Sequence, residues 1–361
     1  MKWLKCALLI VLMAAGCFCL NSCNKKKAIK RPTSNDFESL SGKDTDSWQY
    51  IKTKEDFEHL QLFKGIYEQR KDFLATPDTE ARIPKAVHFI WIGPRPYPRA
   101  SVENIRMWMA QNPDWTFYFW TDRSRPLPCP GMQVRNVQDL GLLYVGDCLA
   151  KSDNQAEKSD LLRLEILYRE GGVYVDHDVK CFKSFSALNH AYDFYCGMDM
   201  PYTSSLPTCV YTTNNLIASK AGHPILLRSM QMLRDQWDEI QASYPGADRD
   251  AVLNRVLHRT FWLFGDAFKK CNNQEGNRDI AFPPYYFNAP NDELAMYSRH
   301  LYAGTWHETE SVFEKMVRQR LMYLSKKSNK MLLFFSVMST LNVIGFIVLF
   351  NMLRKRVRTN A

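Results

Sequence analysis

Acidic residues are missing from both ends of this 361-residue sequence. Residues 1–31 and 326–361 each hold seven Lys or Arg residues and no Asp or Glu. These ends contribute +14, so the overall net charge of +9 leaves −5 for the residues between them. A protein that follows nucleic acid phosphates needs its positive charge on the folded surface. The charge distribution therefore argues against nucleic acid binding.

The part between the charged ends lacks any CxxC pair, which argues against a zinc site. It nevertheless contains six scattered cysteines, which fit either free thiols in a reducing compartment or three disulfides outside one: Cys129, Cys148, Cys181, Cys196, Cys209 and Cys271. The sequence also has no internal repeat. With 46% apolar residues and 24% charged residues, it has the composition of a chain that buries a sizeable core.

Two uncharged segments lie next to the basic residues. Residues 6–20 follow two lysines, and the lipobox-like sequence Leu20-Asn21-Ser22-Cys23 stands at their end. This pattern predicts a signal peptide or membrane anchor over 1–23. Residues 331–353 are 23 uncharged residues between Lys330 and Arg354. That length predicts a transmembrane helix, followed by a basic tail over 354–361.

If both segments span a membrane, eight basic residues flank the body side and six lie on the other side. This count slightly favours a cytoplasmic-facing body at the membrane. A body in the lumen of the secretory pathway and an exported lipoprotein are the alternatives.

The chain between these segments divides into a polar stem and one folded domain. Residues 24–55 are polar and charged, which predicts a solvated stem, and 56–325 form the expected domain. Apolar positions from Phe57 onward recur at helical spacing until Pro77. A β-rich run over 86–92, a helix over 101–111 and a strand over 115–120 follow in β-α-β order, which predicts a parallel, nucleotide-binding type of sheet.

Two carboxylates follow a short buried strand over 173–175, in the sequence Asp176-His177-Asp178. The carboxyl ends of strands are where open α/β sheets bind ligands. Two hard oxygen ligands at that place suit Mg²⁺ or Mn²⁺ with a diphosphate. The pattern alone is also typical of an ordinary turn.

A helix over 156–169 precedes this strand and ends at Gly171-Gly172. Asp160 and Arg163 are three residues apart on it and therefore share one face. The alternative is a surface ion pair worth under about 1 kcal/mol. Because leucine and isoleucine make most sides of the helix apolar, we expect the pair to be buried, where sugar hydroxyls would serve both side chains.

The run from Ser159-Asp160-x-x-Arg163 to Gly171-Gly172-Val173-Tyr174-Val175-Asp176-x-Asp178 closely resembles the DXD sugar-binding region of glycosyltransferase family 32. This family comprises membrane mannosyl- and hexosyltransferases related to the large glucosylating toxins. Three further stretches are similar to family segments, so that the resemblance spans about 83 to 307: Ile83 to Gly93, Asn214 to Ser219 with Gly222-His223-Pro224, and His300 with Ala303-Gly304-Thr305-Trp306.

The resemblance implies a GT-A-like, Rossmann-type α/β sheet with flanking helices. It also implies a nucleotide-sugar donor, a glycan or lipid acceptor, a Mn²⁺ or Mg²⁺ cofactor and transfer with retention. Trp91 would stack on the base, unless it is a core tryptophan. Ser159, Asp160 and Arg163 would bind the donor. Asp176 would contact ribose and metal, Asp178 would bind the metal, and His300 would be a further ligand unless it is a plain surface histidine.

The sequence departs from the family at Phe264-Gly265-Asp266, where a Gly-Pro is usual, and this leaves the acceptor side open. Two other functions compete. A haloacid-dehalogenase-type phosphatase would use Asp176 as its nucleophile and Asp266 in its closing acidic motif. A membrane-anchored sugar-binding protein would keep the fold without activity.

Overall fold

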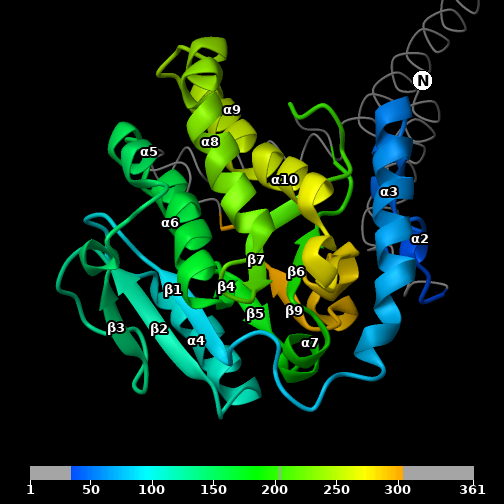
Figure 1. Cartoon of the computed structure of the whole chain (residues 1–361), viewed down its shortest axis with the longest axis horizontal. Coiled ribbons are helices and arrows are strands. Elements are labelled where there is room, and N and C mark those ends of the chain that lie inside the picture. The colour runs from blue at the N-terminus through cyan, green and yellow to red at the C-terminus, as the bar shows by residue number, and fades with distance from the viewer. Residues whose placement is uncertain (1–33, 203–204, 304–361) are drawn as a thin grey trace, which may run out of the picture. The chain divides into compact units, whose positions relative to one another are not determined.

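The computed structural model describes residues 34–202 and 205–303. Its strands are β1 Ala86–Ile90, β2 Thr116–Thr121, β3 Gln133–Asn136, β4 Gly172–Val175, β5 Val179–Cys181, β6 Phe194–Met198, β7 Thr212–Ser219, β8 Asp279–Phe282 and β9 Ser298–His300. Its α-helices are α2 Phe37–Leu40, α3 Lys54–Arg70, α4 Arg99–Gln111, α5 Gly146–Lys151, α6 Gln155–Glu170, α7 Ser186–Ala191, α8 Pro224–Ser243, α9 Arg249–Val256 and α10 Leu263–Cys271 (Figure 1).

A seven-stranded sheet in the order β3-β2-β1-β4-β7-β6-β8 forms the centre of the described part of the chain. The first four strands in this order are parallel, which confirms the β-α-β prediction. β7, however, is antiparallel to both β4 and β6, so the sheet is mixed rather than fully parallel. Among the described residues between β6 and β7 there is no helix, and none is needed because antiparallel neighbours require no helical crossover.

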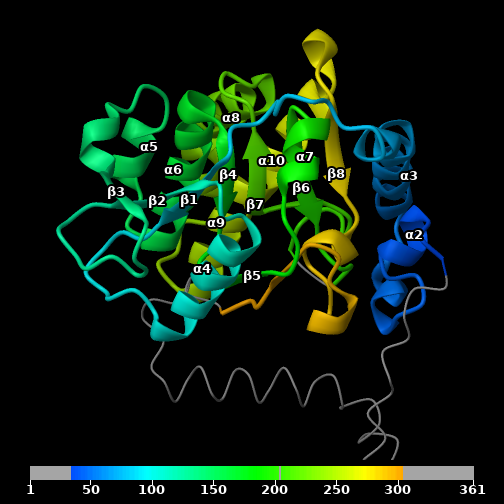
Figure 2. The same cartoon turned by 90° about the horizontal axis from the view of Figure 1, so that it is seen from below.

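The chain reverses its direction across the sheet at β1. β2 and β3 are added on one side of β1, and β4 returns to its other side. Since crossovers between parallel strands are right-handed, α4 and α6 then cover opposite faces of the sheet (Figure 2). The gap between the carboxyl ends of β1 and β4 is therefore a topological switch point, where such sheets bind ligands.

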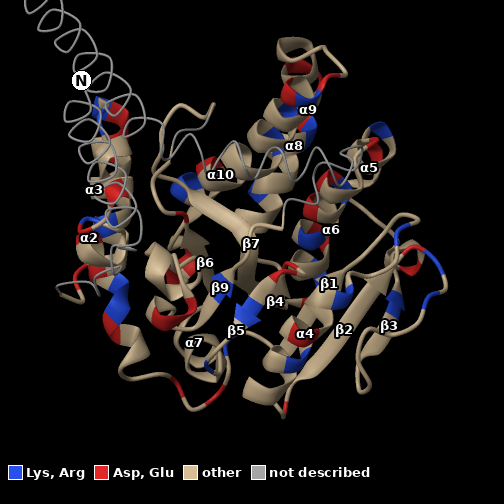
Figure 3. Cartoon of the chain, turned by 180° about the vertical axis from the view of Figure 1, so that it is seen from behind, with Lys and Arg blue, Asp and Glu red and all other residues tan. Residues whose placement is uncertain are grey.

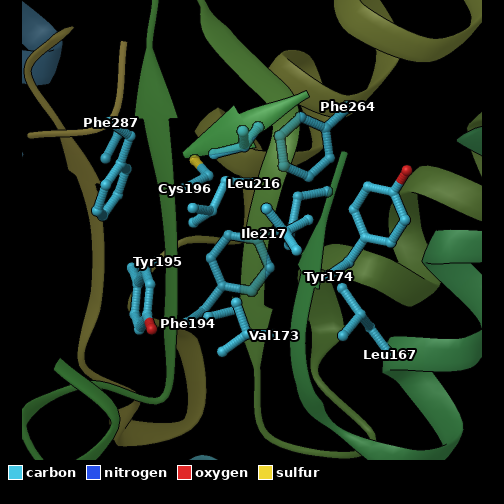
Figure 4. Packing of buried hydrophobic residues seen from close by; sticks show 14 of the residues in the cluster. Leu167, Val173, Tyr174, Phe194, Tyr195, Cys196, Leu216, Ile217, Phe264 and Phe287 are labelled. Carbon is cyan, nitrogen blue, oxygen red and sulfur yellow. The ribbon is translucent and has the colours of Figure 1, made fainter. Parts of the chain in front are cut away.

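The core lies along the middle strands. Every residue of β4, β6 and β7 is buried. Phe194 and Val173 lie close to Ile217 in this layer, and Phe264 of α10 reaches it from above (Figure 4). Rigid central strands of this kind hold the residues at their ends in fixed positions.

Residues 34–55 differ from the solvated stem that their composition suggests. Phe37 and Leu40 are 0% and 2% exposed, and the Phe37 ring lies 5.6 Å from that of Tyr67 on α3. Because most residues around Phe37 and Leu40 are polar, the sequence did not predict that these two side chains are buried. The part of the stem before residue 34 lies outside the described residues.

The helix expected from Phe57 onward is α3, which contacts the edge strand β8. It begins with a capping box in which Thr53 and Asp56 bond reciprocally. Asp56 is 3% exposed and also accepts bonds from Thr208 Oγ1 at 2.7 Å and the Cys209 backbone N–H at 2.9 Å. Burial tends to raise the pKa of Asp56, but the bonds from the N–H groups of Lys52, Thr53 and Cys209 hold it well below its usual value.

We expect Asp56→Ala to lower the free energy of unfolding by about 3 kcal/mol, because several buried donors lose a charged acceptor. The wild-type contribution should be complete above the unfolded pKa of about 4 and disappear as the pH falls below it. Urea unfolding at neutral and acidic pH measures both effects. Glu58→Ala, which removes a carboxylate whose side chain is 61% exposed on the same helix, should change stability by under about 0.5 kcal/mol. Equal effects of the two substitutions would contradict this role of Asp56.

The six cysteines of this region are free thiols, and all except Cys271 are buried. The three disulfides considered as an alternative are therefore not formed. None of the helices within 34–202 and 205–303 is long and apolar enough to span a membrane. The segments over 1–23 and 331–353, the basic tail, and Gly304-Thr305-Trp306 lie outside the described residues. Lys/Arg and Asp/Glu are interspersed over the described part (Figure 3).

Candidate active site

The candidate site lies at the switch point of the sheet. β1 and β4 pair in parallel, with Val87 opposite Val173, so their carboxyl ends meet at one edge. Trp91 follows β1 directly, and Asp176-His177-Asp178 follows β4 directly. The sheet topology thus brings together two segments that are far apart in the sequence.

The turn that holds the two carboxylates is fixed by α4. Ser101 Oγ lies 2.8 Å from His177 Nδ1, and Asn104 Nδ2 donates to the His177 carbonyl at 3.0 Å. The middle residue of the motif therefore anchors the turn to the neighbouring helix, while Asp176 and Asp178 remain at its two ends.

Asp160 and Arg163 are buried on α6, as their apolar neighbours predict. They are 1% and 2% exposed and form an ion pair with each other. Arg163 also donates to Asp176 Oδ1 at 3.1 Å and to the Asn214 carbonyl at 2.5 Å. The alternative of an ordinary surface ion pair is therefore wrong, because Arg163 joins α6 to the DXD turn and to β7.

The charges of this pair depend on each other. Burial raises the pKa of Asp160, and the guanidinium of Arg163 opposes that rise. Burial likewise disfavours the charged form of Arg163, but Asp160 and Tyr174 keep its pKa above the usual value. The guanidinium also lies 4.1 Å from the centre of the Tyr174 ring. Arg163 is thus a permanently charged group enclosed by the protein.

Tyr174 is a site residue that the sequence analysis did not single out. Its hydroxyl donates to Asp176 Oδ1 at 2.6 Å. Tyr174 and Asp176 are two residues apart along an extended strand and therefore point to the same face. This spacing of two residues could have predicted from the sequence that Tyr174 lies on the same side as Asp176. Asn214 was noticed only as part of a family segment, yet its Nδ2 donates to Asp160 Oδ2 at 3.2 Å.

Asp178 lies in a closed environment with His300. Asp178 is 6% exposed, and its Oδ1 lies 3.3 Å from His300 Nε2 on β9. Burial acts to raise the pKa of Asp178, but His300 and the backbone N–H of Ala303 hold it well below its usual value. Burial acts to lower the pKa of His300, while Asp178 raises it above the usual value. His300 is therefore not a plain surface histidine.

One ligand atom each from Asp176, Asp178 and His300 lies within 4.8 Å of the other two. Among the residues that the structure describes, this is the group of side chains that fits a metal ion. Two carboxylates offer the hard oxygen ligands that Mg²⁺ and Mn²⁺ take together with phosphate oxygens, and the imidazole adds a nitrogen ligand. The chemistry of these side chains fits the expected divalent cation.

Trp91 is only partly buried, which contradicts the alternative of an enclosed core tryptophan. Its Nε1 donates to the Arg95 carbonyl at 2.8 Å. Its ring meets Tyr97 and His177 edge to face, with centroids 5.4 and 5.1 Å away. Ser159 is also partly exposed, and its hydroxyl donates to the Gln155 carbonyl at 3.1 Å.

The segment that imitates a phosphatase motif lies elsewhere. Asp266 on α10 forms ion pairs with Lys269 and Lys270 and is not part of the Asp176, Asp178 and His300 group. A phosphatase of the proposed type would need Asp266 beside the first aspartate. The position of Asp266 therefore argues against the phosphatase alternative.

Comparison with known proteins agrees with this geometry. The family model described as "Glycosyltransferase sugar-binding region containing DXD motif" matches residues 98–195. The chain carries a DXD glycosyltransferase region. The resemblance to family 32 is thereby confirmed. A model described as "Capsular polysaccharide synthesis protein" matches residues 149–244.

Curated relatives of this glycosyltransferase region come from a bacterium and a yeast. "Subversion of eukaryotic traffic protein A" of Legionella pneumophila is 27% identical over 218 residues, which cover 56% of this chain and 33% of that protein. "Inositol phosphoceramide mannosyltransferase 3" of Schizosaccharomyces pombe is 28% identical over 156 residues, which cover 42% of this chain and 38% of that protein. The chain therefore spans well under half the length of these two relatives.

A solved structure titled "PaToxG Glycosyltransferase" is also similar to the chain. It is 19% identical, with a TM-score of 0.40, and the match covers 59% of this chain and 77% of that one.

Proposed function

We propose that the chain transfers a hexose from a nucleotide-sugar donor to a hydroxyl group of a glycan or lipid, with a divalent cation and with retention of configuration. The observation that supports this most strongly is the group of Asp176, Asp178 and His300 at the switch point, beside a partly exposed tryptophan. A metal group of this kind would bind the diphosphate of a nucleotide, and an aromatic ring beside it would stack on the base.

Each predicted site residue has a place in this proposal. Trp91 stacks on the base, Asp176 contacts the ribose and the metal, and Asp178 and His300 complete the metal site. Mn²⁺ or Mg²⁺ would, when bound there, stabilise the negative charge that develops on the departing diphosphate. Ser159, directly before Asp160 on α6, would bind the donor as well.

Asp160 and Arg163 are proposed to hold hydroxyls of the donor sugar. Arg163 Nε and Asn214 Oδ1 are buried and have no hydrogen-bond partner within the described part of the chain. Buried polar atoms normally have a partner, so a sugar hydroxyl that reached them would satisfy both. Arg163 would at the same time hold Asp176 in place through its bond to Oδ1.

For retention we propose a front-face displacement. The bond between the acceptor oxygen and the anomeric carbon forms on the face from which the diphosphate leaves. The acceptor proton passes to the departing phosphate oxygen, which takes the electron pair of the broken bond. The Arg163 and Asp176 contacts would keep the donor fixed during this step.

The test is incubation of the full chain with Mn²⁺ and a panel of nucleotide sugars, with detection of the released nucleoside diphosphate. We expect slow hydrolysis of one donor, because water replaces the missing acceptor, and loss of this hydrolysis with excess chelator. Turnover that survives the chelator would contradict the metal-dependent mechanism. Binding of a donor without any turnover would instead favour the inactive sugar-binding protein.

We further propose that residues 331–353 hold the protein in the membrane with the body facing the cytoplasm, where nucleotide sugars are made. The chain should therefore stay in the membrane fraction after removal of residues 1–31, since a spanning segment is held far more firmly than a single acyl chain. Protease added to intact cells should spare the region between Phe57 and Met322. Cleavage there from outside would contradict the cytoplasmic orientation and favour an exported or lumenal body.

A further inference from the structure

Asp199 is a carboxylate near the candidate site to which neither the sequence nor the proposed function gives a role. It follows β6 directly. β6 runs antiparallel to β7, and β7 antiparallel to β4, so β6 and β4 run in the same direction. Asp199 therefore lies at the same edge of the sheet as Asp176, two strands away.

The contacts of Asp199 leave one of its oxygens available. The hydroxyl of Tyr302 and the backbone N–H of Met200, the latter at 2.9 Å, both donate to Oδ1. Among the residues with described positions, none donates a hydrogen bond to Oδ2. A carboxylate oxygen that is held in place and has free lone pairs accepts hydrogen bonds from a ligand hydroxyl.

Tyr302 connects Asp199 to the metal group. Its backbone has a φ of 52°, in the left-handed region that bulky residues rarely adopt. The flanking residues hold it there, because Leu301 N–H donates to the Asp178 carbonyl at 2.9 Å and Ala303 N–H to Asp178 Oδ2 at 2.6 Å. Backbone strain of this kind concentrates at functional sites.

Two exposed tyrosine rings stand beside Asp199. Tyr302 is 53% exposed and Tyr202 is 38% exposed, so both rings present part of their area to solvent. The Tyr202 hydroxyl accepts a hydrogen bond from Tyr211, whose ring centre is 6.1 Å away. Aromatic faces next to a fixed carboxylate offer both an apolar surface for a sugar ring and an acceptor for its hydroxyls.

We propose that Asp199, Tyr302 and Tyr202 form the acceptor subsite, and that it takes a sugar or polyol ring. This inference rests on the proposed transfer function and adds the class of acceptor. Trp91 follows β1 on one side of β4, whereas Asp199 follows β6, which lies on the other side of β4 beyond β7. A ring bound at Asp199 would therefore approach the metal group from the side opposite the nucleotide.

Ligand-observed saturation-transfer NMR on the full chain tests this subsite without any turnover. The probes are methyl α-D-mannopyranoside and myo-inositol, titrated with Mg²⁺ and either UDP or GDP present. We expect at least one probe to bind. Asp199→Asn should weaken that binding by at least about tenfold, because a neutral amide is a poorer acceptor than a carboxylate. Tyr302→Phe should weaken it several-fold by releasing Asp199 from its hydrogen bond.

Asp238→Asn is the matched control, because its side chain is 83% exposed on α8 and pairs only with Lys151 in the described region. It should leave probe binding unchanged. Calorimetric binding of UDP or GDP, together with a melting curve for each variant, separates local loss from unfolding. Absence of probe binding by the wild type, or binding within about twofold of wild type in both site variants, would overturn the subsite. Failure to bind either nucleotide would count against the transferase proposal instead.

Discussion

Asp178→Asn should reduce transfer to below about a tenth of the wild-type rate while the protein still folds. The amide has nearly the size of the carboxylate, but it is a poor ligand for a hard cation. It can still accept the backbone bond from Ala303, which the wild-type side chain accepts at 2.6 Å. The measurement is nucleoside diphosphate release with Mn²⁺ at saturating donor, beside a thermal melting curve.

Chelation of the wild type should have the same effect as this substitution, because both remove the cation from the same carboxylates. Asp238→Asn serves as the control for the chemical change alone and should retain full activity. Activity of Asp178→Asn above about a tenth of wild type would contradict the metal role.

Arg163→Ala should produce the largest loss of stability at the site, about 3–5 kcal/mol, because it leaves Asp160 buried without its counterion. The same change removes the bond to Asp176 Oδ1 and should release that carboxylate from its position. Urea unfolding measures the stability, and binding of UDP or GDP with Mg²⁺ measures the remaining site.

Arg163→Lys distinguishes a functional role from a structural one, since it keeps the charge but loses the planar fork that reaches Asp160, Asp176 and Asn214 together. If the proposed role is correct, this variant folds and binds nucleotide, yet transfers poorly. Asp160→Ala should likewise lose transfer while it retains nucleotide binding. If these variants lose activity only in proportion to unfolding, the pair is purely structural.

The candidate site was partly accessible from the sequence because its central parts are local. The apolar strand before Asp176, the helix before it and the i, i+3 spacing of Asp160 and Arg163 are all contained in about twenty neighbouring residues. Such patterns fix secondary structure and the end of a strand, since they depend on the periods of helix and strand. The burial of Asp160 and Arg163 followed from the leucines around them.

Contacts between distant segments were less predictable. His300 was expected near the metal only through the family resemblance, and its 3.3 Å approach to Asp178 depends on the pairing of β5 with β9. Tyr302 and Asp199 gave no signal, because each lies just after a strand, β9 or β6, where no periodic pattern continues. The burial of Phe37 and Leu40 was not predicted either, because the mostly polar residues around them form no periodic apolar pattern.

The α/β class, the two carboxylates at a strand end and the buried charged pair on the preceding helix could all be inferred from the amino-acid sequence. These features arise from residue periodicity and from the places that charged groups tolerate. The three-dimensional structure was needed to show that Arg163 holds Asp176, that His300 completes a group with Asp178, and that β7 runs antiparallel to its neighbours in the sheet. The physical reason is that strand order and long-range packing minimise the free energy of the whole chain, and no local spacing records which distant segments become neighbours.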